Sequence, residues 1–269
     1  MKGRPSLTHS WLRSCAVAGA LLAAAGCGSS SSSNGMPPGA AGTARVRFAE
    51  GAPELVATIN GLPQCIGTSY LQMDGQTVNS SFAYGTLTQF TLVPPGTHEL
   101  TVLDDLGYRV GPIKTAALSA GKNYTLVITG IGASTCNPPK LPTYSVITFE
   151  EPPNSNEAQL SLYEASPKVP KADFGSFDAS SNAHYTKLGS ATLGNVVTVT
   201  VGKSVTNFGG YAGTGVQPFY GGTVTPVQVD GFDTQNALPF QRAARLSLFL
   251  FDAKTGSCPC GPVLGSLDR

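Results

Sequence analysis

The chain has 269 residues, a formal net charge of +1 at pH 7, and only 12% charged residues. This near-neutral balance gives no electrostatic basis for binding nucleic acid. Gly (32 residues) and Pro (20 residues) are abundant, and 41% of the residues are hydrophobic, which is enough for folded cores. This composition is typical of an extracytoplasmic all-β protein with many turns.

Residues 1–26 predict a signal peptide. Lys2, Arg4 and Arg13 make a basic start, and an apolar segment follows at 16–25. That segment is too short to cross a bilayer as a helix, which needs about 20 residues. It ends in Leu21-Leu22-Ala23-Ala24-Ala25-Gly26-Cys27, which resembles the lipobox of bacterial lipoproteins.

The lipobox resemblance implies that Cys27 carries a diacylglyceryl lipid, with further acylation of palmitate type. Two or more acyl chains make membrane anchoring stable. The membrane is therefore an expected partner, through Cys27, of an extracytoplasmic protein. Gly28, in place of Asp, favours the outer membrane or the cell surface. The alternative is an ordinary secretory signal in which Cys27 occurs by chance.

Residues 27–43 are rich in Ser, Gly, Pro and Ala and predict a flexible tether. A first domain is expected at 44–150. Its opening segment, 44–50, alternates apolar and polar residues, as half-buried strands do. Further short strands, separated by turns that contain Pro or Gly, are predicted at 55–59, 70–73, 86–93, 98–103, 115–118, 124–128 and 144–149. This spacing favours a β-sandwich or barrel, and we predict an immunoglobulin-like or transthyretin-like sandwich.

The pattern restarts after a polar, Pro-containing linker at 151–157. Residues 44–53 align without a gap to residues 158–167, sharing Ala, Glu and Pro at equivalent positions. Tyr84-Gly85-Thr86 resembles Leu188-Gly189-Ser190. We therefore predict a second, tandem β-sandwich domain at 158–253, followed by a C-terminal tail at 254–269. Chance similarity between two β-rich openings is the alternative.

The first domain also carries an ordered set of short motifs. They are Ala44-Arg45-Val46-Arg47, Ala52-Pro53, Tyr84-Gly85-Thr86, Pro95-Gly96-Thr97 and Ala120-Gly121-Lys122-Asn123-Tyr124-Thr125. This order resembles the bacterial surface domain known as domain of unknown function 4397. The resemblance covers most of 44–150 and, more weakly, 158–250. It implies a secreted or surface-anchored β-domain that often occurs in tandem.

The chain departs from this family after the first strand. Family members commonly have His-Ala-Ser-Pro-Asp-Ala-Pro there, whereas this chain has Glu50-Gly51-Ala52-Pro53-Glu54. The second copy has Glu164 at the position of the His. A site that depends on the family's His and Asp is therefore not expected here.

The four cysteines downstream of Cys27 are expected to form disulfides in an oxidising compartment. Cys65 and Cys136 both lie in the first domain. A bond between them would close a loop of about 70 residues and stabilise the fold by about 4 kcal/mol. Cys258 and Cys260 are separated only by Pro259, so a bond between them would be strained. Whether they pair with each other stays open; a redox or metal element is the alternative to a structural bridge.

No signature of catalysis accompanies the polar residues. His98 and His184 have no nucleophile or metal-ligand motif around them. Glu99, Asp104 and Asp105 lack the spacing of a calcium loop. We therefore expect no catalytic residue, no cofactor and no metal site.

The segment 208–222 combines glycines with the aromatic residues Phe208, Tyr211, Phe219 and Tyr220. Exposed aromatic rings can stack on sugars or dock peptides, and glycines permit close approach. The alternative is that these rings fill the core. The sequence thus predicts a non-catalytic, lipid-anchored envelope or surface protein with a structural, adhesive or ligand-binding role. A carbohydrate-binding accessory lipoprotein that uses 208–222 is the second hypothesis, and the glycan or protein partner stays unidentified.

Overall fold

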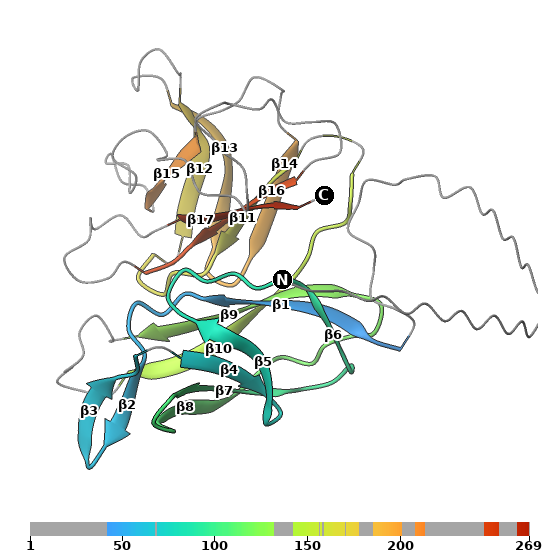
Figure 1. The fold of residues 1–269 in the computed structure, drawn as a ribbon. Coiled ribbons are helices and arrows are strands. Elements are labelled where there is room, and N and C mark those ends of the chain that lie inside the picture. Colours follow the sequence, from blue (N-terminus) through green and yellow to red (C-terminus); the bar gives the residue numbers. More distant parts are fainter. Residues whose placement is uncertain are drawn as a thin grey trace, which may run out of the picture. The chain divides into compact units, whose positions relative to one another are not determined.

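The computed structural model describes residues 42–67, 69–131, 142–155, 157, 159–169, 171–177, 185–200, 208–212, 245–252 and 263–268. Within these ranges the chain is all-β, with β-strands and no helix. All of the described residues belong to one compact unit. Their sheets form two groups, which we call the first and the second sheet pair (Figure 1).

The first sheet pair contains two four-stranded sheets, which fit a β-sandwich. One sheet has the order β10-β9-β1-β6, in which β1 is parallel to β9 and the other pairings are antiparallel. The other sheet has the order β5-β4-β7-β8 and is antiparallel. The strands are β1 (Ala44–Glu50), β4 (Ser69–Met73), β5 (Gln76–Phe82), β6 (Thr91–Val93), β7 (Glu99–Asp104), β8 (Arg109–Lys114), β9 (Asn123–Ile131) and β10 (Thr143–Glu150).

Alternate residues of these strands build the core between the two sheets. Phe48 and Leu126 come from one sheet, and Leu71, Leu100 and Val102 from the other, and all five are buried to 1% exposure or less. Burying each such side chain contributes about 1.5–3 kcal/mol. Because side chains alternate along a strand, the intervening residues of β4 and β7 lie on the opposite face and are partly exposed.

Two hairpins turn at residues that have positive φ. Asn60 and Gly61 (φ 51° and 80°) join β2 (Val56–Ile59) to β3 (Leu62–Cys65), and Asp74 and Gly75 (φ 51° and 78°) join β4 to β5. Two-residue turns with positive φ at both positions match the twist of the paired strands, and Asn-Gly and Asp-Gly adopt them most readily. Figure 1 shows hairpin β2–β3 projecting from the rest of the first sheet pair.

The second sheet pair has a four-stranded sheet of order β14-β11-β16-β17 and a three-stranded sheet of order β13-β12-β15. Leu160, Leu162, Phe174 and Leu250 are among the buried residues of its core. β11 is parallel to β16, whereas its pairing with β14 is antiparallel. The strands are β11 (Gln159–Glu164), β12 (Lys171–Phe177), β13 (Tyr185–Thr192), β14 (Val196–Thr200), β15 (Phe208–Ala212), β16 (Arg245–Leu250) and β17 (Val263–Asp268).

A third apolar cluster joins the two sheet pairs. Phe149 of β10 contacts Tyr163 of β11 edge to face, with ring centroids 5.3 Å apart, and Tyr163 stacks on Phe249 of β16 at 4.2 Å. Consequently β1 and β11 are buried on both faces, and Arg45 is the one residue of β1 that is not buried. The strand predicted at 44–50 is confirmed, but its expected exposed face is covered. A sheet that packs on both faces loses the simple exposed-and-buried alternation.

The predicted strands agree with the structure at 44–50, 55–59, 70–73, 98–103, 124–128 and 144–149, within one to three residues at each end. Two were wrong. In 86–93 only Thr91–Val93 is a strand, preceded by a single bridge between Ala49 and Leu87, and in 115–118 only Leu118 makes a bridge, to Gly96. The sequence analysis missed β3, β5 and β8, which are short or rich in polar residues. β17 joins β16 from within the segment expected to be a tail.

Candidate functional site

The most elaborate polar arrangement in the described residues surrounds the carboxylate of Glu151, which directly follows β10. It accepts hydrogen bonds from Arg47 Nη2 (3.2 Å), Arg245 Nη2 (3.1 Å), the Tyr163 hydroxyl (2.6 Å) and the Thr125 hydroxyl. All five side chains belong to buried residues. A buried charge is tolerated only when it is paired and hydrogen-bonded. We call these five residues the Glu151 cluster.

The Glu151 cluster draws on both sheet pairs. Arg47 lies on β1 and Thr125 on β9, whereas Tyr163 lies on β11 and Arg245 on β16. Arg47 Nε also donates to the Thr125 hydroxyl (2.7 Å). Glu151, in the segment whose polar composition predicts a linker, therefore ties strands of both pairs together.

The remaining contacts of the two arginines complete the cluster. The Arg47 guanidinium lies over the rings of Phe90 (4.7 Å) and Phe249 (5.4 Å), and Arg245 Nη1 donates to the Pro152 carbonyl at 2.7 Å. Such cation–π contacts gain strength when desolvated. Burial, and next the Glu151 charge, raise the pKa of Tyr163 well above its usual range, so Tyr163 stays a neutral hydrogen-bond donor. The cluster is thus built for cohesion and exposes no group to a substrate.

Glu50 and Glu164, the residues at the position of the family's His, form a second arrangement. Both are fully buried, and each accepts the backbone N–H two residues ahead at 2.8 Å, from Ala52 and Ser166 respectively. The other carboxyl oxygen of each has no hydrogen-bond partner. Burial raises the pKa of Glu50 well above its usual range and that of Glu164 to about 8. Glu164 is therefore mostly protonated at neutral pH, and burial favours the neutral form of Glu50 as well.

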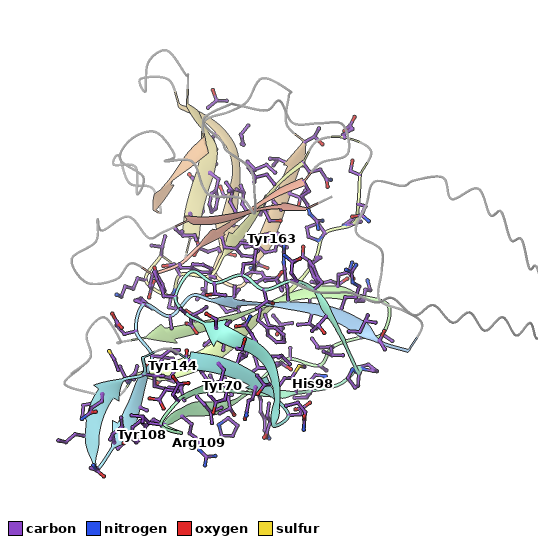
Figure 2. The ribbon with its side chains drawn as sticks, viewed as in Figure 1. Tyr70, His98, Tyr108, Arg109, Tyr144 and Tyr163 are labelled. Atoms are coloured by element: carbon purple, nitrogen blue, oxygen red, sulfur yellow. The ribbon has the colours of Figure 1, made fainter. Side chains whose placement is uncertain are left out.

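His98, the one histidine among the described residues, is buried in the first sheet pair. Its Nδ1 lies 2.6 Å from Asp74 Oδ2 and its Nε2 2.9 Å from the Pro94 carbonyl. Asp74 also accepts the Glu99 N–H at 2.9 Å. Burial opposes ionisation of Asp74, but the bonds from Glu99 and His98 outweigh it and lower its pKa. Figure 2 shows His98 and Tyr108 at opposite ends of β7. Both ring nitrogens thus make contacts, and the contact with Asp74 links His98 to the β4–β5 turn.

The structure separates the acidic residues that the sequence analysis considered for calcium. Asp104 is buried, and its Oδ1 accepts the N–H groups of Leu106 and Tyr108, whereas Glu99 and Asp105 are exposed. Across the described ranges, no group of three or more His, Cys, Asp or Glu side chains could hold a metal ion. In the same ranges no helix is long and apolar enough to span a membrane.

Most of the predicted site residues lie outside the described ranges. They are Cys27, Cys136, Cys258, Cys260, Phe219 and Tyr220; His184, at which no site was expected, also lies outside these ranges. Cys65 ends β3 and is partly buried, and its bond to Cys136 stays a prediction. Phe208 and Tyr211 lie on β15, which pairs with β12. Phe208 and Tyr211 therefore share one strand, whereas Cys65 belongs to hairpin β2–β3.

The sequence analysis missed the Glu151 cluster for a clear reason. Arg47 alternates with apolar neighbours and so has the pattern of a solvent-facing residue, and Glu151 opens a polar, Pro-rich stretch. Only the packing of a second sheet on β1 buries both. The sequence did hold a signal for Glu50 and Glu164, because the alignment of 44–53 with 158–167 places the two glutamates at the same position.

Residues 44–175 match the family described as Domain of unknown function (DUF4397), so the chain contains a domain of this family. The match runs from β1 through Gly175 in β12 and thus includes the first two strands of the second sheet pair. No curated protein matches the chain.

Proposed function

We propose that the protein is a non-catalytic, lipid-anchored component of the bacterial cell envelope or surface that presents two tandem β-sandwich domains. The observation that carries this proposal is the Leu-Leu-Ala-Ala-Ala-Gly-Cys sequence ending at Cys27, followed by the Ser-rich tether. Two or three acyl chains on Cys27 hold a protein on a membrane stably. The role of the folded part is structural, adhesive or ligand-binding.

The strand pairing supports the tandem part of the proposal. In the first sheet pair Arg45 pairs with Asn123 and Glu50 with Ile128; in the second, Gln159 pairs with Arg245 and Glu164 with Leu250. Both are parallel pairings six residues long, with an antiparallel strand on either side.

The turn before the outer strand agrees with this correspondence. The Gly85 and Gly194 N–H groups donate to the carbonyls of Glu50 and Glu164, and both glycines have φ +82°. Gly194 therefore corresponds to Gly85. Gly189, which the sequence alignment chose, lies inside β13 instead.

The buried polar residues support a non-catalytic role. Both ring nitrogens of His98 make contacts within the fold, and Arg47 and Arg245 of the Glu151 cluster both pair with the one carboxylate of Glu151. Such side chains stabilise the fold and are held away from any substrate.

The lipid anchor is tested by changing Cys27 to Ser. The wild-type protein should partition with membranes and incorporate labelled palmitate, whereas C27S should lose the label and appear in the soluble fraction. Cys15→Ser is the matched control, because Cys15 lies within the predicted signal and should not affect anchoring. Membrane retention of C27S without detergent would refute the anchor, and unlabelled wild-type protein would do the same.

A second candidate function is carbohydrate binding through 208–222. It is favoured by the place of β15 at one end of the sheet order β13-β12-β15, where the segment enters the fold. A glycan array tests it with wild-type protein and with Tyr211→Ala plus Tyr220→Ala, using Tyr70→Ala on β4 as the control. Saturable binding that only the double variant loses supports this function. Absence of binding, or equal binding by the double variant, refutes it.

A further inference from the structure

Ser166 bridges two buried carboxyl groups in the second sheet pair. Its N–H donates to Glu164 Oε1 at 2.8 Å, and its hydroxyl donates to Asp252 Oδ1. The Lys168 N–H also donates to Asp252 Oδ1, at 3.1 Å. Glu164, Ser166 and Asp252 are each exposed by 2% or less. Two buried carboxyl groups that are bonded to the N–H and the hydroxyl of the same serine repel each other when both are ionised.

The hydrogen bonds distinguish the two carboxyl groups. Asp252 Oδ1 accepts two hydrogen bonds, and donors of this kind favour a carboxylate over a neutral acid. Glu164 Oε1 accepts only one, and the second oxygen of each group, Glu164 Oε2 and Asp252 Oδ2, is buried without a partner. Burial, together with the Asp252 charge, raises the pKa of Glu164 to about 8. The Glu164 proton therefore leaves in a pH range that a protein outside the cytoplasm can meet.

The residues beside both carboxyl groups contact the first sheet pair. The Tyr84 hydroxyl donates to the Asp252 backbone carbonyl, and the Thr129 hydroxyl donates to the Ala165 carbonyl at 3.3 Å. Phe251 packs so closely on Gly51 that a Cβ on this glycine would lie 2.7 Å from the Phe251 ring. A displacement of 164–166 or 251–252 must therefore disturb this contact.

The corresponding position of the first sheet pair lacks the second carboxyl group. Parallel pairing matches Glu50 with Ile128 and Glu164 with Leu250. Two residues further on, the first pair has Gly130 where the second has Asp252. Glu50 therefore serves as a comparison within the same protein: it is a buried carboxyl group with no acidic residue at the position that Asp252 occupies.

We propose that Glu164 and Asp252 form a proton-dependent latch, in which protonated Glu164 keeps residues 164–166 and 251–252 seated on the first sheet pair and ionised Glu164 releases them. Asn195 from the turn before β14 and Tyr84 and Thr129 from the first pair contact the backbone of the latch, and none of the three has a basic group that could offset a second negative charge. Lys168, whose N–H bonds Asp252, is exposed to solvent. The segment must then move to admit water.

Hydrogen exchange of the full-length protein in detergent, measured from pH 6 to pH 9 and corrected for intrinsic rates, tests the latch. In the wild type, amides of 245–252 and of 126–131 should exchange at least tenfold faster above pH 8 than at pH 6. Glu164→Gln mimics the protonated acid and should abolish this dependence. Glu99→Gln, an exposed site on β7, should leave it intact. Equal dependence in E164Q, or no dependence in the wild type, would overturn the proposal.

Asp252→Asn provides an independent test in case E164Q folds poorly. It keeps the side-chain shape and removes the repelling charge, so the rise in exchange should be several-fold smaller than in the wild type. Carbon-13 NMR of the Glu side chains gives a direct reading: one carboxyl signal absent from E164Q should titrate near pH 8, and D252N should move its midpoint to lower pH. A Glu164 signal that titrates near pH 4–5 in the wild type would overturn the latch.

Discussion

Replacing Glu151 by Gln should destabilise the protein by about 3–5 kcal/mol, which is the typical effect of removing one partner from a buried ion pair. The amide keeps the volume of the carboxylate. It cannot, however, neutralise Arg47 and Arg245, which approach the carboxylate oxygens at 3.2 and 3.1 Å from side chains exposed by only 2% and 6%. The amide NH₂ would also face an arginine donor, or the Tyr163 hydroxyl, as donor against donor. The loss should therefore exceed that of a single neutral hydrogen bond, about 0.5–1.5 kcal/mol.

The neighbouring residue supplies the control. Glu150 pairs with Lys122 at 2.6 Å, but both side chains are 53% exposed, and pairs of this kind contribute about 0–1 kcal/mol. Urea unfolding of wild type, E151Q and E150Q compares the two carboxylates. For an m-value of about 3 kcal/mol per molar, the E151Q midpoint should fall by about 1–1.7 M. The E150Q midpoint should change by less than about 0.3 M.

The shape of the E151Q unfolding transition also tests whether Glu151 holds the two sheet pairs together. Because Glu151 contacts β1 and β9 as well as β11 and β16, its loss should make the two pairs unfold in separate steps, seen as a broadened or biphasic transition. An E151Q midpoint within 0.3 M of the wild type, or an equal shift in E150Q, would refute the assignment of Glu151 as the central buried anchor.

Two further substitutions test the packing and the hairpin. Gly51→Val should lower the free energy of unfolding by about 1–3 kcal/mol, because its Cβ would meet the Phe251 ring at 2.7 Å. Gly67→Ala is the control, because Gly67 has open space around it and the change should not affect thermal unfolding. Equal melting temperatures of the two variants would contradict the tight contact at Gly51. Asp74→Asn should weaken the fold at neutral pH. The lowered pKa of Asp74 means that the carboxylate stabilises the fold above its unfolded pKa of about 3.8 and loses this effect as pH falls through the lower, folded pKa. The stability difference between D74N and wild type should therefore shrink as the pH falls below the unfolded pKa of about 3.8, and a constant difference from pH 7 to pH 2 would show that the contact with His98 is not electrostatic.

Local signals predicted the strands whose pattern is complete within a few residues. The alternation in 70–73 and 98–103 and the apolar run at 124–128 predicted β4, β7 and β9, because burial of one face requires that spacing. The strand β5 was missed because Gln76, Thr77, Asn79, Ser80 and Ser81 are polar. Its cue was the Asp74-Gly75 turn, which returns the chain onto β4.

The sequence by itself determined the all-β character and most strands of the first sheet pair, and it predicted the correspondence of Glu50 with Glu164. These depend on alternation, turn residues and matching order, which are properties of neighbouring residues. Only the tertiary structure decided that Arg47 and Glu151 are buried, that Glu164 lies near Asp252, and that Phe149, Tyr163 and Phe249 form one contact. Those residues are 86 to 104 positions apart or belong to different sheets. Burial of a charge depends on what covers the strand, and no local pattern records which segment that will be.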